Sequence, residues 1–124
     1  LDTDILDLNL LAYHDNDSIS TIYFEISNEN ILYKRSDSSA AFFSRLRISY
    51  LLSDEKDSKK ISDSSTFYLS DRSESEYVKT KILYAKARLK VKLGGNYLLD
   101  IEAIDVNKKA RYSTTLKINL SSHV

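Results

Sequence analysis

The sequence has 124 residues, and its 18 Lys and Arg balance its 18 Asp and Glu, so the formal net charge is zero. A neutral chain without an arginine-rich arm is a poor candidate for nucleic-acid binding, which needs a surplus of cations. No apolar run approaches the roughly 18 residues of a membrane-spanning helix. We therefore expect one domain over residues 1–124, with no nucleic-acid partner and no membrane insertion.

Several residue types that carry chemistry are rare or missing. The chain has no Cys, which excludes disulfides, thiolate metal sites and cysteine nucleophiles, and it has only two Gly. Tight active-site turns and phosphate-binding loops depend on glycine, so we expect neither an enzyme nor a bound cofactor. Because the sequence begins with Leu1, we expect it to be part of a longer envelope or secreted protein.

The first half of the chain alternates apolar and polar residues with a period of two, the pattern of strands with one buried face. Leu8 and Leu10 alternate with Asp7 and Asn9, for example. The pattern predicts strands over about 5–13, 22–26 and 40–52, turns over 14–18 and 27–30, and a short apolar segment at 31–33.

The second half continues the alternation after a polar connection over 53–60. We expect a weaker strand containing Ile61, Phe67 and Leu69, then a polar loop over 71–76. Strands are predicted over about 83–93, 97–103 and 110–120. Residues 74–92 are rich in helix formers, but a helix would scatter the apolar row that starts at Leu83 around its circumference, so a strand is predicted there.

About seven strands separated by turns predict an all-β fold, an immunoglobulin-like antiparallel sandwich of two sheets. In that topology the third and sixth strands are neighbours. Their outer faces would then place the cations of Arg45 and Arg47 near the carboxylates of Asp100 and Glu102.

Residues 93–99, Leu-Gly-Gly-Asn-Tyr-Leu-Leu, resemble the tyrosine corner of immunoglobulin-like and fibronectin-type sandwiches. The resemblance implies that the hydroxyl of Tyr97 bonds the backbone a few residues upstream. It also implies that Gly95 permits a close approach.

A wider resemblance covers most of the chain. It rests on Leu-Leu-Ala-Tyr at 10–13, Ile-Tyr-Phe-Glu-Ile at 22–26, Ile-Leu-Tyr at 31–33 and Gly-x-Tyr-x-Leu-x-Ile-x-Ala-x-Asp at 95–105. These segments resemble the N-terminal sandwich of bacterial GWxTD-domain proteins. The family's Gly-Trp-x-Thr-Asp motif is absent, because the chain has no Trp, and Gly94 replaces the usual Pro. The resemblance implies a non-catalytic module of an extracytoplasmic, envelope-associated protein, and it implies no catalytic residues.

One turn collects an imidazole and carboxylates. His14 next to Asp15 and Asp17 could act as a general base, although no serine nucleophile in a glycine elbow accompanies it, and a solvated turn is the plainer interpretation. Calcium is the alternative, because hard cations bind clustered carboxylate and amide oxygens. Such a site would need the loops that carry these residues to meet: Asp15, Asn16 and Asp17 with Asp105 and Asn107.

In this class of sandwich we expect the first, second and fifth strands to lie together, and their outer faces carry the strongest candidate interaction surface. Exposed aromatic residues are typical of protein interfaces and of sugar-binding sheets, although cross-strand packing is the plainer interpretation. A basic row continues from them and would suit an acidic partner or protect a sheet edge. The surface comprises Tyr13, Tyr23, Ile82, Tyr84, Lys86, Arg88, Lys90 and Lys92.

We therefore expect an interaction or spacer module that contacts other domains of the same chain or a protein partner. The alternative is a glycan-binding module that uses the exposed tyrosines.

Overall fold

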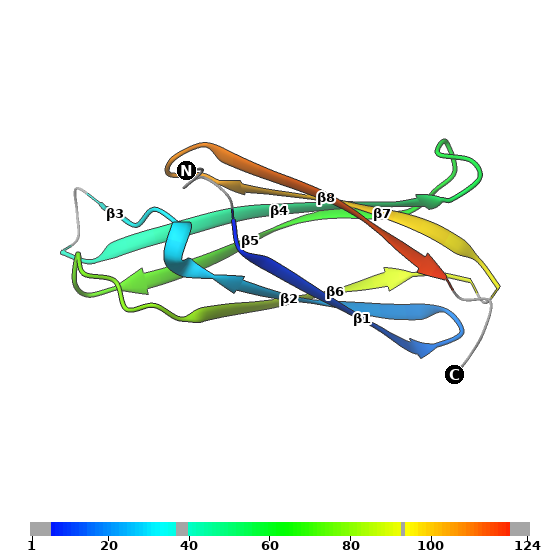
Figure 1. Cartoon of the computed structure of the whole chain (residues 1–124), viewed down its shortest axis with the longest axis horizontal. Coiled ribbons are helices and arrows are strands. Elements are labelled where there is room, and N and C mark those ends of the chain that lie inside the picture. Colours follow the sequence, from blue (N-terminus) through cyan, green and yellow to red (C-terminus); the bar gives the residue numbers. More distant parts are fainter. Residues whose placement is uncertain (1–5, 37–39, 93, 120–124) are drawn as a thin grey trace.

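The computed structural model describes residues 6–36, 40–92 and 94–119, and over these ranges nearly all of the regular secondary structure is β-strand (Figure 1). The elements in chain order are β1 (Leu8–Asn16), β2 (Ile19–Ser27), the short 3-10 helix η1 (Asn28–Asn30), β3 (Lys34–Arg35), β4 (Phe42–Asp54), β5 (Ile61–Ser73), β6 (Ile82–Lys90), β7 (Asn96–Asp105) and β8 (Ala110–Asn119).

These strands form two antiparallel sheets packed face to face, which confirms the predicted all-β sandwich (Figure 1). One sheet has three strands in the order β1-β2-β6. The other has five: β5 pairs along one edge of β4, while the short β3 and then β7 pair along the opposite edge, and β8 lies beyond β7. Two sequence-based predictions are therefore confirmed: the first, second and fifth long strands share one sheet, and the third and sixth are neighbours.

The core lies between the sheets and is built from the inward positions of the alternating strands. In β2 the inward residues Ile22, Phe24 and Ile26 are at most 1% exposed. The ring of Phe67, on β5, packs edge-to-face on Phe24 with the centroids 5.7 Å apart. The segment 82–90 is a strand with Leu83 and Leu89 buried, so its helix-forming composition is overridden by its alternation.

The tyrosine corner is present. The backbone N–H of Lys92 donates to the hydroxyl oxygen of Tyr97 at 2.8 Å, five residues upstream of the ring. A Cβ atom on Gly95 would lie 2.6 Å from Cε2 of Tyr97, so this position requires glycine. Gly94 has a positive φ of 81°, which also favours glycine. The preceding Leu93 lies outside the described residues.

Two predictions about details are wrong. The outer-face ion pairs do not form as expected, because β4 and β7 pair with Arg47 opposite Ile104 and Ser49 opposite Glu102. Glu102 instead pairs with Arg111 at 3.4 Å. The polar loop also starts later than predicted, since β5 extends through Asp71 to Ser73.

No helix in the described part of the chain is long and apolar enough to cross a membrane.

Candidate functional site: the outer face of the three-stranded sheet

The predicted interaction residues all lie on the outer face of the β1-β2-β6 sheet or just beyond it. Register places Tyr23 between Leu11 on β1 and Lys86 on β6, and Tyr84 opposite Glu25. Alternation sends these side chains away from the core. We call the apolar part of this surface the tyrosine face; it consists of Leu11, Tyr13, Tyr23, Ile82 and Tyr84, with exposed fractions of 41%, 55%, 39%, 46% and 68%.

The tyrosine face is hollowed. Leu11, Tyr13, Tyr23 and Tyr84 line an open depression of about 650 Å³, which His14, Asp15 and Glu25 complete. The rings of Tyr13 and Tyr23 meet edge-to-face, with centroids 5.5 Å apart and planes at 78°. The two rings therefore form a wedge with apolar walls, and they do not form a flat platform.

The basic row, which consists of Lys86, Arg88, Lys90 and Lys92, runs beside this depression along β6 and just beyond it. Register places Arg88 opposite Thr21 and Lys90 opposite Ile19, so neither faces a carboxylate across the strand pair. Lys86 and Arg88 line a second hollow of about 200 Å³ that shares Tyr23 and Asp15 with the first. Among the described residues, the side chains of Lys86, Arg88, Lys90 and Lys92 make no ion pair within 4.0 Å. The face thus combines an apolar depression, bordered by the carboxylates of Asp15 and Glu25, with basic side chains that make no close ion pair among the described residues.

The His14 turn is held by local hydrogen bonds. Nδ1 of His14 lies 2.7 Å from the hydroxyl of Ser20, and the hydroxyl of Thr21 donates to the carboxylate of Asp15. The side-chain oxygen of Asn16 accepts from the backbone N–H of Ser18 at 2.9 Å. These bonds are those of a structured hairpin turn.

The composite calcium site does not form, because its two loops lie at opposite ends of the sandwich (Figure 1). Asp105 is 3% exposed and accepts the backbone N–H of Leu32 at 2.8 Å, while Nδ2 of Asn107 donates to the carbonyls of Leu32 and Phe43, each at 2.8 Å. Both side chains anchor the segment before β3 to the β7–β8 turn. Within the described ranges, no group of three or more His, Cys, Asp or Glu side chains could hold a metal ion.

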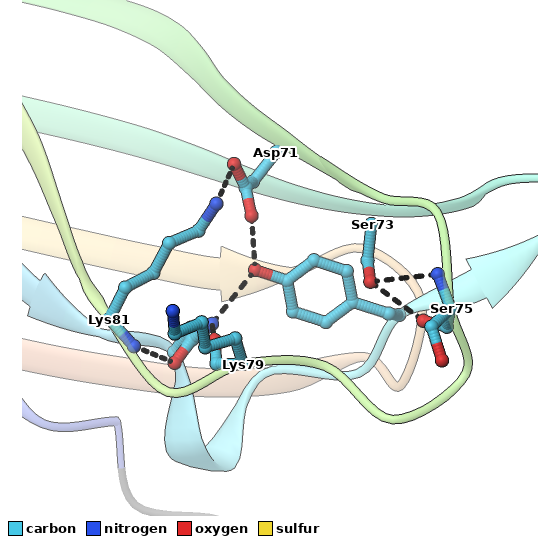
Figure 2. Close-up of polar contacts among 7 residues, drawn as sticks. Asp71, Ser73, Ser75, Lys79 and Lys81 are labelled. Carbon is cyan, nitrogen blue, oxygen red and sulfur yellow. Dashed lines mark hydrogen bonds and ion pairs between the residues drawn. The ribbon is translucent and has the colours of Figure 1, made fainter.

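A polar network that sequence patterns did not indicate closes one end of the sandwich (Figure 2). The hydroxyl of Tyr33 donates to Oδ2 of Asp71 at 2.6 Å, and Nζ of Lys81 lies 2.9 Å from Oδ1 of the same carboxylate. Asn28 holds the segment before β6 by donating to the carbonyl of Lys79 and accepting from the backbone N–H of Lys81, both at 2.9 Å. Its Nδ2 also lies 3.2 Å from the Tyr33 hydroxyl.

Electrostatics in this network favour the charged carboxylate and the neutral phenol. Burial by itself raises the pKa of Asp71, but the hydrogen bonds from Tyr33 and Lys81 outweigh it and lower that pKa below its usual value. Burial, together with the bond to Asp71, raises the pKa of Tyr33. A raised pKa does not activate a phenol at neutral pH, so this network is a structural connection between loops and strands.

No protein-family model matches the chain, and no curated protein matches it in sequence.

Proposed function

We propose that this chain is a non-catalytic β-sandwich module that binds a protein surface, either another domain of its own chain or a separate partner, through the tyrosine face. The observation that carries the proposal is the exposed apolar depression lined by Tyr13, Tyr23 and Tyr84. Aromatic side chains are enriched at protein interfaces, and contiguous apolar patches on monomers are often functional.

Charge defines the kind of partner. The cations of Lys86 and Arg88 lie beside the depression without a carboxylate within 4.0 Å among the described residues. An acidic partner surface would gain favourable long-range attraction and a faster encounter rate. The proposed partner therefore presents an apolar side chain to the tyrosine wedge and acidic side chains to the β6 row.

The resemblance to the sandwich of GWxTD-domain proteins supports placing the module in a bacterial cell envelope, as an extracytoplasmic spacer or contact domain. The tyrosine corner at Tyr97 is compatible with that resemblance, but it is a property of the fold and would occur in other sandwiches.

A glycan-binding module is the second candidate, favoured by the 68% exposure of Tyr84 beside the depression. A pyranose ring stacks on the flat face of an aromatic ring. The 78° angle between Tyr13 and Tyr23 leaves only part of this surface suited to stacking, which is why the protein partner is placed first.

Tyrosine footprinting tests the proposal. The isolated chain and the longer protein that contains it would be labelled with a tyrosine-selective reagent, and the modified sites would be quantified by mass spectrometry. We expect Tyr13 and Tyr84 to be protected in the longer protein or its native complex. Tyr68 on the other sheet and Tyr77, 50% and 84% exposed, are the matched controls and should react equally in both samples.

Equal labelling of Tyr13 and Tyr84 in both samples contradicts the proposal. Protection of the same tyrosines in the isolated chain by an acidic polysaccharide such as polygalacturonate would favour the glycan candidate instead.

A further inference from the structure

The β1 strand is an open edge of the three-stranded sheet. In the described part of the chain it pairs only with β2. The backbone N–H of Ser27 donates to the carbonyl of Asp7. This bond shows that the backbone groups of Asp7 point toward β2. Because hydrogen-bonding direction alternates along an antiparallel strand, the odd-numbered residues from Asp7 to Tyr13 bond to β2. The N–H and C=O groups of Leu8, Leu10, Ala12 and His14 therefore point outward from the sheet.

The same alternation is visible at the opposite edge of this sheet, where several outward groups near the end of β6 are occupied. On β6, the N–H of Lys90 donates to the carboxylate of Asp63 and its carbonyl accepts from the hydroxyl of Ser62, both at 3.0 Å. The hydroxyl of Tyr50 lies 3.4 Å from the carbonyl of Arg88. These contacts come from the facing sheet and cover the β6 edge at Arg88 and Lys90.

The β1 edge lacks the features that usually prevent strand addition. Proteins protect edges with Lys, Pro, bulges or covering side chains. The segment from Leu8 to His14 contains no charged carboxylate or ammonium and no Pro, whereas β6 carries Lys86 and β8 carries Arg111 and Lys117. The one irregularity in β1 is the register shift between His14 and Asn16, which ends the regular segment at His14.

Both faces of β1 are incompletely covered. On the outer side Leu11 is 41% exposed, and on the inner side Ala12 is exposed while Leu8 and Leu10 are only half-buried against the core. A further strand beside β1 would cover apolar atoms on both faces and would satisfy the outward backbone groups at the same time.

We propose that the β1 edge is a self-association site, at which β1 of a second copy of this chain adds antiparallel to form one continuous six-stranded sheet. The segment Leu8–His14 has no charge, so within it no like charge is met when it pairs with its own copy, which favours a two-fold symmetric contact. Outer faces stay aligned only if odd positions oppose odd positions. The registers that use the segment up to His14 therefore set Ala12 of one copy opposite Leu10 or Ala12 of the other, and set Leu11 opposite Leu11 or Tyr13. This inference concerns the edge and does not depend on the function proposed for the tyrosine face.

Charge reversal at Ala12 tests the proposal, because this side chain lies on the inner side and not on the tyrosine face. Sedimentation velocity of the 124-residue chain should show a monomer–dimer equilibrium that shifts toward the dimer with concentration. Ala12→Lys and Ala12→Glu should each lower the dimer association constant at least tenfold, since like charges then lie directly opposite or diagonal to each other across the two-fold axis. An equimolar mixture of the two variants should restore dimer formation.

Ala12→Pro provides a second readout. The N–H at this position points away from β2. Proline should therefore remove a hydrogen bond between β1 and the added strand, and so weaken the dimer, without removing a β1–β2 bond. Leu11→Pro is the matched control, because it removes a bond to β2 and should lower the unfolding midpoint.

A wild-type chain that sediments as a monomer throughout the micromolar to millimolar range overturns the proposal. It is also overturned by a dimer that the Ala12 variants leave unchanged, since such a dimer would use another surface. Loss of dimer in both charge variants without recovery in the mixture would contradict the symmetric β1 pairing.

Discussion

The Tyr33–Asp71–Lys81 network offers a direct test of how the end of the sandwich is held together. Asp71→Asn keeps the size of the side chain but removes its charge and replaces one acceptor by a donor. The bond from Tyr33 at 2.6 Å and the ion pair with Lys81 at 2.9 Å would both lose their charged acceptor (Figure 2). We expect the variant to fold with the same sheets and with lower stability.

The magnitude follows from the burial of the carboxylate. Hydrogen bonds to a charged group contribute about 1.5–3 kcal/mol, and solvent contact reduces this contribution. The side chain of Asp71 is 17% exposed, so part of the bond from Tyr33 is screened. Lys81 is solvated, and we assign no separate stability to its ion pair. The expected loss for Asp71→Asn is therefore about 1–2 kcal/mol, assigned to the bond with Tyr33.

The assay is urea unfolding followed by circular dichroism, since the chain contains no Trp. Tyr33→Phe should cost a similar amount, and the double variant should cost much less than the sum of the two, because both remove one bond. Glu74→Gln is the matched control: its partner Arg72 lies 2.7 Å away, but the two side chains are 58% and 77% exposed, so we expect a change below about 0.5 kcal/mol. Additive losses in the double variant would refute a direct interaction.

The pH dependence has a definite sign at both ends. The folded pKa of Asp71 lies below its unfolded value of about 3.9, so its contribution is present above pH 4 and is lost as pH falls through the folded pKa. The folded pKa of Tyr33 lies above its unfolded value of about 10, so its contribution is present below pH 10 and is lost as pH rises through the folded pKa. The stability difference between wild type and Asp71→Asn should therefore shrink below about pH 4.

Two further predictions concern the tyrosine corner and the tyrosine face. Tyr97→Phe should lower stability by about 1–2 kcal/mol, because the N–H of Lys92 loses its acceptor, and an unchanged urea midpoint would show that the bond contributes nothing. Gly95→Ala should lower stability less in a Tyr97→Ser background than in the wild type, because the ring that the new Cβ atom would contact is then absent. Tyr23→Ser combined with Tyr84→Ser should change stability by less than about 1 kcal/mol, since both rings lie outside the core, and unfolding like that of a core variant would show that the rings are structural.

The fold was predictable because alternation with period two determines which side chains share a face. The inward row that includes Leu83 and Leu89, and the outward row that includes Tyr84 and Lys86, follow from the sequence alone. Register between strands does not follow from alternation. Any shift by two residues keeps the faces and changes the partners, which is why Arg47 faces Ile104 and Glu102 pairs with Arg111.

The end network was missed for a related reason. Tyr33, Asp71 and Lys81 lie on three separate segments, and only the folded arrangement brings them together. Each has an ordinary local explanation in the sequence: an apolar segment, a polar loop and a lysine before a strand. The calcium site was wrong for the converse reason: the sequence connected two loops with suitable ligand types, and the fold places them at different ends of the sandwich (Figure 1).

The structure also bears on the two interpretations of the basic row. Lysine can protect an edge strand from strand addition, and on β6 the side chain of Lys86 lies at such an edge. Farther along β6, however, the outward backbone groups of Lys90 already bond to Ser62 and Asp63. An edge that is covered in this way needs no charge to protect it. Under the proposed function, the charges of Arg88 and Lys90 would meet a partner on the outer face, and that of Lys86 would also protect the edge. Replacing Arg88 with Gln should accordingly weaken binding of an acidic partner and leave the monomer unchanged.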